Sequence, residues 1–296
     1  MDAMEDVSAK GFEANRGRLF GLAYRMLGSR AEAEDVVQDA YIRWHQSDRS
    51  SIRNPEAWLV SATTRLAIDR LRALKTQREA YTGPWLPEPM TRDTAPAPDQ
   101  RLELASDLSI AFMVLLERLA PEERAAFLLR DVFDFDYGQI ATVLDNSEDA
   151  CRQIVHRART RIKSERKRFE VTEAAKADLL RKFTQAVGAR DEKALIDRFA
   201  PDATWTADGG GRAPAAAHPI VGADHIAKLV IALRDRLQSD RATMELIRVN
   251  GETGLCVRTD GRITAVLAML SDGKHIHAVY SIVNPDKLSA SDGRLN

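Results

Sequence analysis

A proline-rich stretch before residue 100 constrains the fold of this chain more than any other feature. Five of its eleven prolines fall within residues 83–98, in the run GPWLPEPMTRDTAPAP. Proline fixes φ and removes a backbone donor, so helices stop at such a run. Helical patterns cover residues 12–76 before it and residues 103–168 after it. The sequence therefore predicts two helical blocks joined by a linker over residues 77–102.

Length and composition indicate a folded protein of more than one domain. The chain has 296 residues, of which 44% are hydrophobic and 29% charged, which is typical of globular rather than disordered proteins. The two distant cysteines, Cys151 and Cys256, exclude a disulfide framework and a clustered cysteine zinc site. No apolar run approaches the ~18 residues of a membrane span, and the acidic N-terminus does not look like a signal peptide. We therefore expect a cytoplasmic protein without a membrane partner.

Positive charge is concentrated in one short segment of an otherwise balanced chain. Residues 152–168 hold eight Lys and Arg against Glu165 alone, whereas residues 1–151 carry a net charge of −8 and residues 169–296 a net charge of zero. Such a block is typical of an anion-binding surface, although a solvated helix face is the simpler alternative.

Two helices are predicted in the first block. In the first helix, Val37, Tyr41 and Trp44 recur at helical spacing and form a core face. Its acidic face, either solvated or a contact surface, holds Asp35, Gln38 and Asp39. After a polar loop over residues 47–55, Pro55 begins the second helix, whose core stripe is Val60, Ala67, Leu71 and Leu74.

A second stripe on that helix suits nucleic acid. Arg65, Asp69 and Arg72 follow one another at helical spacing, and Trp58 lies near the helix start. Arginine beside an aromatic ring favours single-stranded nucleic acid, where phosphates meet cations and bases stack on rings. The alternative for Trp58 is an ordinary core tryptophan.

The second block contains a helix-turn-helix pattern. Asp136 can cap a short helix from Tyr137, a turn follows at residues 145–146, and Ser147 can cap the next helix. That helix has an apolar face of Cys151, Val155, Ala158 and Ile162. Its outer face is polar and basic, and consists of Arg152, Gln153, His156, Arg157 and Arg159. Such a face can read base edges near the helix start and meet phosphates farther along, although a charged helical hairpin is the alternative.

From residue 173 onward the pattern predicts an α+β domain. Helices are expected at 173–187, near 191–199 and near 223–237, with residues 203–207 and a glycine run between the last two. Strands are expected at 242–249, 255–257, 263–270 and 275–283. Asn250-Gly251, Asp260-Gly261 and Asp272-Gly273 separate these strands and are strong hairpin signals, so an antiparallel sheet is predicted.

Three ordered motifs carry a family resemblance. The segments AEDVVQDAYIRWH, NPEAWLVSATTRLAIDRLRA and LERLAPEERAAFLLRDVFDFDYGQIATVLDNSEDACRQIVHRARTRI resemble regions two and four of bacterial extracytoplasmic-function (ECF) sigma factors. The resemblance covers residues 12–168 and implies a subunit that directs core RNA polymerase to promoters. It departs at the turn, where Asp145 stands in place of the frequent glycine and tolerates αL at some cost.

The resemblance also assigns roles to residues. Asp35, Gln38 and Asp39 would bind the β′ clamp helices of polymerase, and the loop at 47–55 would capture a flipped base of the melted −10 element. The helix flanking that element would use Arg65, Asp69, Arg70 and Arg72. The −35 element would be read as duplex by Ser147, Arg152, Gln153, His156, Arg157 and Arg159, and region four would meet the β flap.

The tail resembles a SnoaL-like domain, an α+β cone that one branch of these sigma factors carries. Its marks are Trp85-Leu86-Pro87 in the linker, Asp208-Gly209-Gly210-Gly211-Arg212, and Asn284-Pro285-Asp286-Lys287. In that branch the extension is thought to replace an anti-sigma factor. We expect an Asp208–Arg212 pair and an exposed Trp85 that anchors the tail to the linker and region two, although the glycines could be a plain flexible turn.

An enzyme or a small-molecule sensor is the competing interpretation of the tail. Candidate acid–base residues are Asp208, His218, His225, His275 and His277, of which the last two could share a metal on one strand. No third ligand stands at a defined spacing, and we expect no enzyme, cofactor or metal. The expected domains are region two (1–76), the linker (77–102), region four (103–170) and the SnoaL-like domain (171–296).

Overall fold

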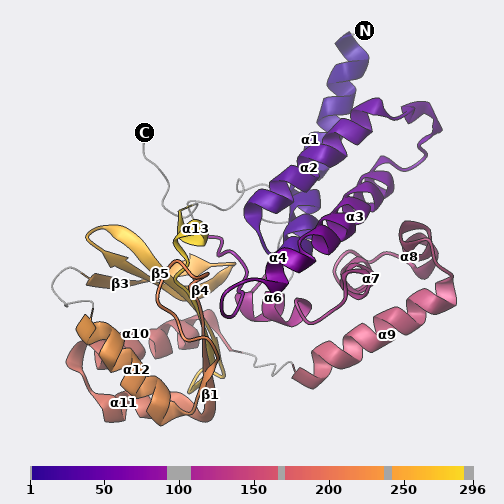
Figure 1. Cartoon of the computed structure of the whole chain (residues 1–296). Coiled ribbons are helices and arrows are strands. Elements are labelled where there is room, and N and C mark those ends of the chain that lie inside the picture. The colour runs from indigo at the N-terminus through magenta and orange to yellow at the C-terminus, as the bar shows by residue number, and fades with distance from the viewer. Residues whose placement is uncertain (1, 92–107, 166–170, 237–241, 290–296) are drawn as a thin grey trace. The chain divides into compact units, whose positions relative to one another are not determined.

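The computed structural model of the chain forms two compact units, each described by itself (Figure 1). It describes residues 2–91, 108–165, 171–236 and 242–289. The first unit takes in the helices up to residue 79 and those from 112 onward. The second unit holds residues 80–91 of the proline-rich segment together with the C-terminal part of the chain. The predicted linker residues 92–102 and the basic residues Arg166, Lys167 and Arg168 lie outside the described residues.

The first unit is built from helices within its described residues. Its N-terminal half contains α1 (Asp2–Leu27), α2 (Arg30–Gln46), the short 3-10 helix η1 (Arg49–Ser51), α3 (Pro55–Ala73) and α4 (Lys75–Glu79). Its second half contains α6 (Ile110–Leu116), α7 (Pro121–Asp131), α8 (Tyr137–Leu144) and α9 (Glu148–Glu165). The two predicted helical blocks are thus confirmed, and Figure 1 shows them in indigo to magenta.

The predicted start of α3 is confirmed in detail. The Asn54 side chain accepts a hydrogen bond of 3.1 Å from the Ala57 amide, and Pro55 occupies the first helical position, where its missing N–H costs nothing. Val60, Ala67 and Leu71 are buried, as the core stripe predicts. On α2, Val37 and Trp44 are likewise buried.

The helix-turn-helix also follows its sequence signals. Asp136 accepts a 2.7 Å bond from the Gln139 amide, and the Gln139 side chain returns a bond to the Asp136 amide at 2.9 Å. Asp145 ends α8 in the left-handed region at φ 51°. The Ser147 hydroxyl accepts from the Ala150 amide at 3.2 Å at the start of α9. The predicted apolar face of α9 is buried, and consists of Cys151, Val155, Ala158 and Ile162.

The second unit is a six-stranded mixed sheet with helices on one face. In chain order it contains α10 (Glu173–Ala189), α11 (Glu192–Ile196), β1 (Phe199–Asp208), β2 (Ile220–Val221), α12 (Ala223–Arg236), β3 (Ala242–Val249), β4 (Glu252–Thr259), β5 (Arg262–Ser271), β6 (Ile276–Ile282) and α13 (Pro285–Leu288). The strand order is β2-β1-β6-β5-β4-β3. Figure 1 shows α10, α11 and α12 grouped beside this sheet.

The prediction of a wholly antiparallel sheet is wrong at one pair of strands. β1 pairs with β6 in parallel, with Trp205 opposite Val279, whereas β3 to β6 form the predicted antiparallel ladder. Parallel pairing needs a long crossover, and here α12 and the four strands β2 to β5 lie between β1 and β6 in the chain. Phe199, expected in a short helix, instead begins β1 because it pairs with Ile276 of β6, and its ring packs edge-on against Phe183, 6.0 Å between centroids.

The core of this unit lies between the sheet and its helices. Phe183 and Leu180 of α10 and Ile226 of α12 pack there against Trp205 and Leu267 of the sheet. The turns at Asn250-Gly251 and Asp260-Gly261 take positive φ at both residues, which confirms the hairpin prediction. Among the described helices, none is both long and apolar enough for a membrane crossing.

Candidate functional site

An exposed acidic face lies on α2. Asp35, Gln38 and Asp39 are all exposed there, on the side away from buried Val37. Sequence reasoning missed Ile42, whose 44% exposure is unusual for so large an apolar side chain. Ile42 follows Gln38 by one helical turn, and an apolar residue off the core stripe was the signal that could have identified it. This acidic face with an apolar neighbour is suited to binding another protein.

The basic stripe of α3 contacts the helix-turn-helix. Arg65 donates from Nη2 to the Thr142 carbonyl at 2.6 Å and from Nε to the Val143 carbonyl at 3.0 Å. These carbonyls lie at the C-terminal end of α8, where a helix presents unsatisfied acceptors and partial negative charge. The helix predicted to flank the −10 element therefore contacts α8, the first helix of the helix-turn-helix, within the first unit.

The other members of the stripe form ion pairs. Arg70 binds Glu32, with Nη2 2.8 Å from Oε1, and the hydrogen bond raises its pKa. Arg72 binds Glu122 of α7, Nε to Oε1 3.0 Å, and its pKa is raised by the same kind of bond. Arg72 also lies 3.3 Å from Asp69. Because these side chains are about half exposed, each pair contributes little to stability.

The outer face of α9 is only partly engaged. Gln153, His156 and Arg157 are exposed. Arg152 pairs with Glu148 at 3.0 Å and lies 4.9 Å from the Tyr137 ring centroid. Arg159 binds Asp131 at 2.6 Å, a bond that raises its pKa. The first three residues are thus presented for contact, whereas the two arginines already have acidic partners.

Trp58 lies beside a cavity in the first unit. It is half-buried and packs on Trp44, with ring centroids 5.4 Å apart. The cavity, of about 420 Å³, is lined by Trp58 and Arg65 of α3 and by Gln139 and Thr142 of α8. Nearby, the exposed Asp48 accepts bonds from the Ser50 hydroxyl at 2.6 Å and its amide at 3.1 Å, which lower its pKa.

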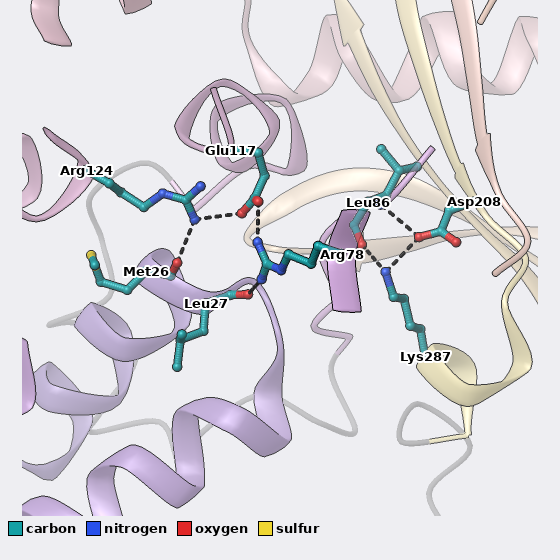
Figure 2. A network of polar contacts seen from close by, with 8 residues as sticks. All are labelled: Met26, Leu27, Arg78, Leu86, Glu117, Arg124, Asp208 and Lys287. Atoms are coloured by element: carbon teal, nitrogen blue, oxygen red, sulfur yellow. Dashed lines mark hydrogen bonds and ion pairs between the residues drawn. The ribbon is translucent and has the colours of Figure 1, made fainter. Parts of the chain in front are cut away.

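A buried polar cluster holds α4 against the second helical half (Figure 2). Glu117 accepts hydrogen bonds from Arg78 and, at 2.7 Å, from Arg124. Arg124 is 1% exposed and donates a second bond of 2.6 Å to the Met26 carbonyl, while Arg78 donates to the Leu27 carbonyl. Burial lowers the pKa of Arg78. This cluster ties α1 and α4 of the first half to α6 and α7.

A second cluster, within the second unit, binds the proline-rich segment to the C-terminal domain (Figure 2). We call it the linker site; its centre is Asp208, which is fully buried at the end of β1. Its carboxylate accepts from the Tyr81 hydroxyl at 2.6 Å and from the Leu86 amide at 2.8 Å. Lys287 Nζ lies 2.7 Å from the same carboxylate and also donates to the Leu86 carbonyl. The buried charge is therefore both paired and hydrogen-bonded, as burial requires.

The remaining motif residues complete the linker site. Asn284 donates to the Tyr81 oxygen at 2.8 Å, and its own side chain caps α13 by accepting from the Asp286 amide. Lys287 lies 4.1 Å from the Trp85 ring centroid and 5.1 Å from that of Tyr81. Burial, followed by the bond to Asp208, raises the pKa of Tyr81 well above its usual value, so this phenol remains a donor.

The structure corrects one expectation about these motifs, the Asp208–Arg212 pair, and refines a second, since Trp85 contacts Lys287 but is not fully exposed. Asp208 pairs with Lys287 rather than with Arg212, and Arg212 instead binds Asp286 at 3.2 Å on the surface. Asp208 points into the sheet end, where α13 brings Lys287, whereas Arg212 lies beyond a tight glycine turn. Trp85 is only half-buried, and the deeply buried linker side chain is Leu86, 2% exposed. Leu86 belongs to the Trp85-Leu86-Pro87 motif, but nothing in the sequence distinguishes it from Trp85 as the buried member.

Farther along, the same segment is fixed to the sheet. The Met90 amide donates to the Asn250 side chain and the Asn250 amide to the Met90 carbonyl, both at 2.8 Å. Met90 and Thr91 are buried. Cys256 and Val266, on the sheet face opposite the helices, are also fully buried. Because Met90 is hydrogen-bonded to Asn250 and both Met90 and Thr91 are buried, the linker segment is an integral part of the second unit.

The candidate acid–base residues are dispersed. His277 lies 3.0 Å from Asp272, and His275 lies 3.7 Å from the same carboxylate. His218 and His225 are exposed, and His225 binds the Val221 carbonyl at 2.9 Å. Among the described residues, no group of three or more His, Cys, Asp or Glu is arranged to hold a metal. Asp208, the fifth candidate, is already fully engaged by the linker.

Comparison with known families matches both helical halves. Residues 12–77 match the model of Sigma-70 region 2, and residues 109–162 match that of Sigma-70 region 4. The first range contains α2 and α3, and the second contains α7, α8 and all but the last three residues of α9. The helix-turn-helix therefore lies inside the region-four match.

Similarity to known proteins extends over the whole chain. The chain is 37% identical over 293 residues to the ECF RNA polymerase sigma factor SigJ of Mycobacterium tuberculosis, covering 95% of this chain and 93% of that protein. A probable ECF sigma factor, SigI, of the same species is 29% identical and covers 97% of each. The crystal structure of SigJ matches with a TM-score of 0.77 over 97% of this chain. The chain therefore belongs to the ECF RNA polymerase sigma factors, in the branch with a fused SnoaL-like domain, and it directs core RNA polymerase to promoters.

Proposed function

We propose that this sigma factor is regulated by capture of its own linker in the C-terminal domain. The observation that carries the proposal is the buried carboxylate of Asp208, which binds linker Tyr81 and Leu86 while paired with Lys287. Such a group is strongly held, because removing either partner of a buried ion pair leaves an uncompensated charge. The linker is thus a bound ligand of the domain rather than a passive tether.

Capture of the linker shortens the distance that the chain can span between region two and region four. The chain between α4 and α6 is about 30 residues long and can span on the order of 100 Å when extended. With residues 81–91 held on the sheet, only about 18 residues remain before α6, and a chain of that length spans at most on the order of 60 Å. The C-terminal domain would therefore restrict the promoter spacings that the sigma factor accepts.

The residue roles follow from the surfaces described above. Asp35, Gln38 and Asp39, joined by Ile42, would contact the β′ clamp helices of core polymerase. The helix α3, through Arg65, Asp69, Arg70 and Arg72, would meet the −10 element. Ser147 would fix the start of α9, whose Arg152, Gln153, His156, Arg157 and Arg159 would meet the −35 duplex. Because polymerase and promoter DNA are cytoplasmic, we infer the same location for this protein.

The C-terminal domain would regulate without catalysing a reaction. Its main cavity is lined by none of the five candidate acid–base residues within the described chain. General acid–base catalysis needs such a group within hydrogen-bond reach of the substrate. We therefore assign this domain a binding role.

The first test removes the charge at the centre of the linker site. Asp208→Asn keeps the size of the side chain but loses the Lys287 pair and one acceptor. We expect faster amide exchange at Leu86 and Met90, and run-off transcription from a wider range of −10 to −35 spacings in a promoter library. Both measurements use the full chain, and the transcription assay also contains core polymerase.

The matched control is Asp286→Asn. Asp286 is 61% exposed and pairs with Arg212 on the surface, so its loss should change neither exchange nor spacing preference. If Asp208→Asn leaves Leu86 exchange and the spacing range as they are in the parent protein, capture of the linker does not regulate this sigma factor.

A further inference from the structure

The C-terminal domain contains a cavity that is separate from the contacts by which it binds the linker. The cavity has a volume of about 680 Å³ and lies between α10, α12 and the inner face of the sheet. Its walls include Phe183, Trp205 and Leu267, all of which are buried. A void of this size equals the volume of roughly 20 water molecules, at about 30 Å³ each. It falls in the range of small-molecule sites, about 300–1,000 Å³.

The polar groups around this cavity favour an anion. Ser281, 3% exposed, contributes a hydroxyl among apolar neighbours on the inner sheet face. Arg234 and Arg236 of α12 also line the cavity, and among its described lining residues there is no Asp, Glu, His or Lys. Arg234 donates to the Gly188 carbonyl at 3.1 Å and lies 3.9 Å from Asp235. Arg236 is exposed, so its guanidinium is accessible to a charged ligand.

We propose that this cavity binds one apolar organic anion, a molecule with a ring or branched hydrocarbon body and a single carboxylate or sulfonate. The body would fill the space against Phe183 and Trp205, and the acidic group would face Arg236. Such a site combines a mostly apolar wall with few polar groups that fix orientation. The proposal concerns binding alone and requires no reaction.

The cavity shares its wall with the linker site. Ala213 and Pro214 line it, and they belong to the same glycine loop that begins at Asp208. Val283 also lines it, and its amide donates to the Asp208 carbonyl at 2.9 Å. A ligand that packs on these residues would restrict the loop and hold the linker more firmly. This coupling rests on the linker capture proposed above, whereas binding itself does not.

The test uses two dyes with the same aromatic body. 1-Anilinonaphthalene-8-sulfonate carries an anion, and N-phenyl-1-naphthylamine is its uncharged counterpart. We expect the full-length protein to bind each at one saturable site, with a rise in fluorescence. Ala265→Phe, which places a ring inside the cavity wall, should abolish both signals. Ala232→Phe, which adds the same ring on the exposed side of α12, should leave both unchanged.

The arginine is tested separately on the protein surface, where folding is not at risk. Arg236→Gln should weaken binding of the sulfonate roughly two- to five-fold, as loss of an exposed ion pair does, and leave the uncharged dye unaffected. Absence of saturable binding, or binding that survives Ala265→Phe, overturns the proposed site. Equal effects of Arg236→Gln on both dyes overturn the preference for an anion.

Coupling has its own measurement. Saturating sulfonate dye should slow amide exchange at Leu86 at least two-fold in the parent protein and have no such effect in Asp208→Asn. Unchanged exchange in the parent protein overturns the coupling. Because the dye titrations do not involve the linker, they decide the site even if Asp208→Asn shows that linker capture has no regulatory role.

Discussion

At the scale of single residues, Gly210 shows how closely the linker approaches the C-terminal domain. Its φ is +58°, and a Cβ at this position would lie 2.2 Å from Asn284 Nδ2 and 2.7 Å from the Tyr81 hydroxyl. Both distances are well inside van der Waals contact. Glycine is therefore required here for two reasons, its backbone conformation and the space occupied by linker and Asn284.

Gly210→Ala should loosen the linker as well as strain the backbone. Backbone strain alone is on the order of 1–3 kcal/mol, and the clash would add to it by displacing Tyr81. The measurement is urea unfolding together with Leu86 amide exchange. Gly251→Ala is the control, because Gly251 also has positive φ but has nothing within 4 Å of its Cβ position. Equal destabilisation and equal exchange in the two variants would show that the clash is unimportant.

Asp272 supplies a second prediction, on pH. Burial alone would raise its pKa, but hydrogen bonds from the His275 amide, the His277 ring and the Lys274 amide outweigh burial and hold the pKa well below its usual value. A depressed carboxyl pKa stabilises the folded state above the unfolded pKa of about 3.9, and this contribution is lost as pH falls below it.

Asp272→Asn should therefore remove part of the acid sensitivity. The parent protein should have the higher free energy of unfolding at about pH 5. The difference between the parent protein and the variant should shrink as the pH falls from about 5 to 2. Urea unfolding across this range measures the difference. A difference that stays constant with pH would mean that ionisation of Asp272 does not contribute to the stability of the folded protein.

At the scale of elements, the turn of the helix-turn-helix carries a measurable cost. Asp145 lies at φ 51°, a conformation that glycine adopts without the steric penalty of a Cβ. Asp145→Gly should stabilise the first unit by about 0.5–1 kcal/mol, and Asp145→Ala should destabilise it. Thermal unfolding of the full chain compares the two. Stabilisation by alanine as well would indicate that side-chain loss, not backbone conformation, is responsible.

The elements that sequence could predict are those whose signals are local. Asp136 and Ser147 cap helices and Pro55 begins α3 as their positions indicate, and the Asn250 and Asp260 turns follow directly from the following glycine. Parallel pairing of β1 with β6 was not predictable, because the two strands lie about 70 residues apart. No short motif indicates whether two such distant strands run parallel or antiparallel.

The linker site was predictable in composition but not in pairing. All three motifs that the sequence singles out converge there, including Leu86, Asp208 and Lys287. Which cation meets Asp208 depends on the tertiary path of α13, whereas closeness in sequence alone favours Arg212. Local reasoning identifies the members of such a site, and only the packed chain shows which of them are bonded.

At the scale of the whole molecule, the first unit is closed. Arg65 of α3 holds the end of α8, although the −10 and −35 elements lie roughly 25 base pairs apart, on the order of 80 Å at about 3.4 Å per base pair. With α3 and α9 in the roles proposed above, a sigma factor could not occupy both elements while α3 is bonded to α8. We therefore infer that this conformation opens before promoter binding.

Weakening one closing contact should favour the open form. Glu122→Gln removes the partner of Arg72 without altering a residue assigned to DNA. Because exposed pairs supply about 0.2–1 kcal/mol, we expect transcription at limiting sigma factor to rise roughly two-fold. Run-off assays compare it with Asp178→Asn, which removes a similarly exposed charge within α10. Identical rates for both variants would exclude the Arg72 contact as a brake.

Because the ribosome makes the chain from its N-terminus, the two sides of the linker site are synthesised at different times. Lys287 lies 201 residues after Leu86. A ribosome that adds about 5–20 residues per second needs roughly 10–40 s to cover that interval. If the linker site restrains the sigma factor as proposed, each nascent copy would complete α9, which ends at Glu165, before Lys287 exists, and a burst of synthesis would briefly supply unrestrained molecules.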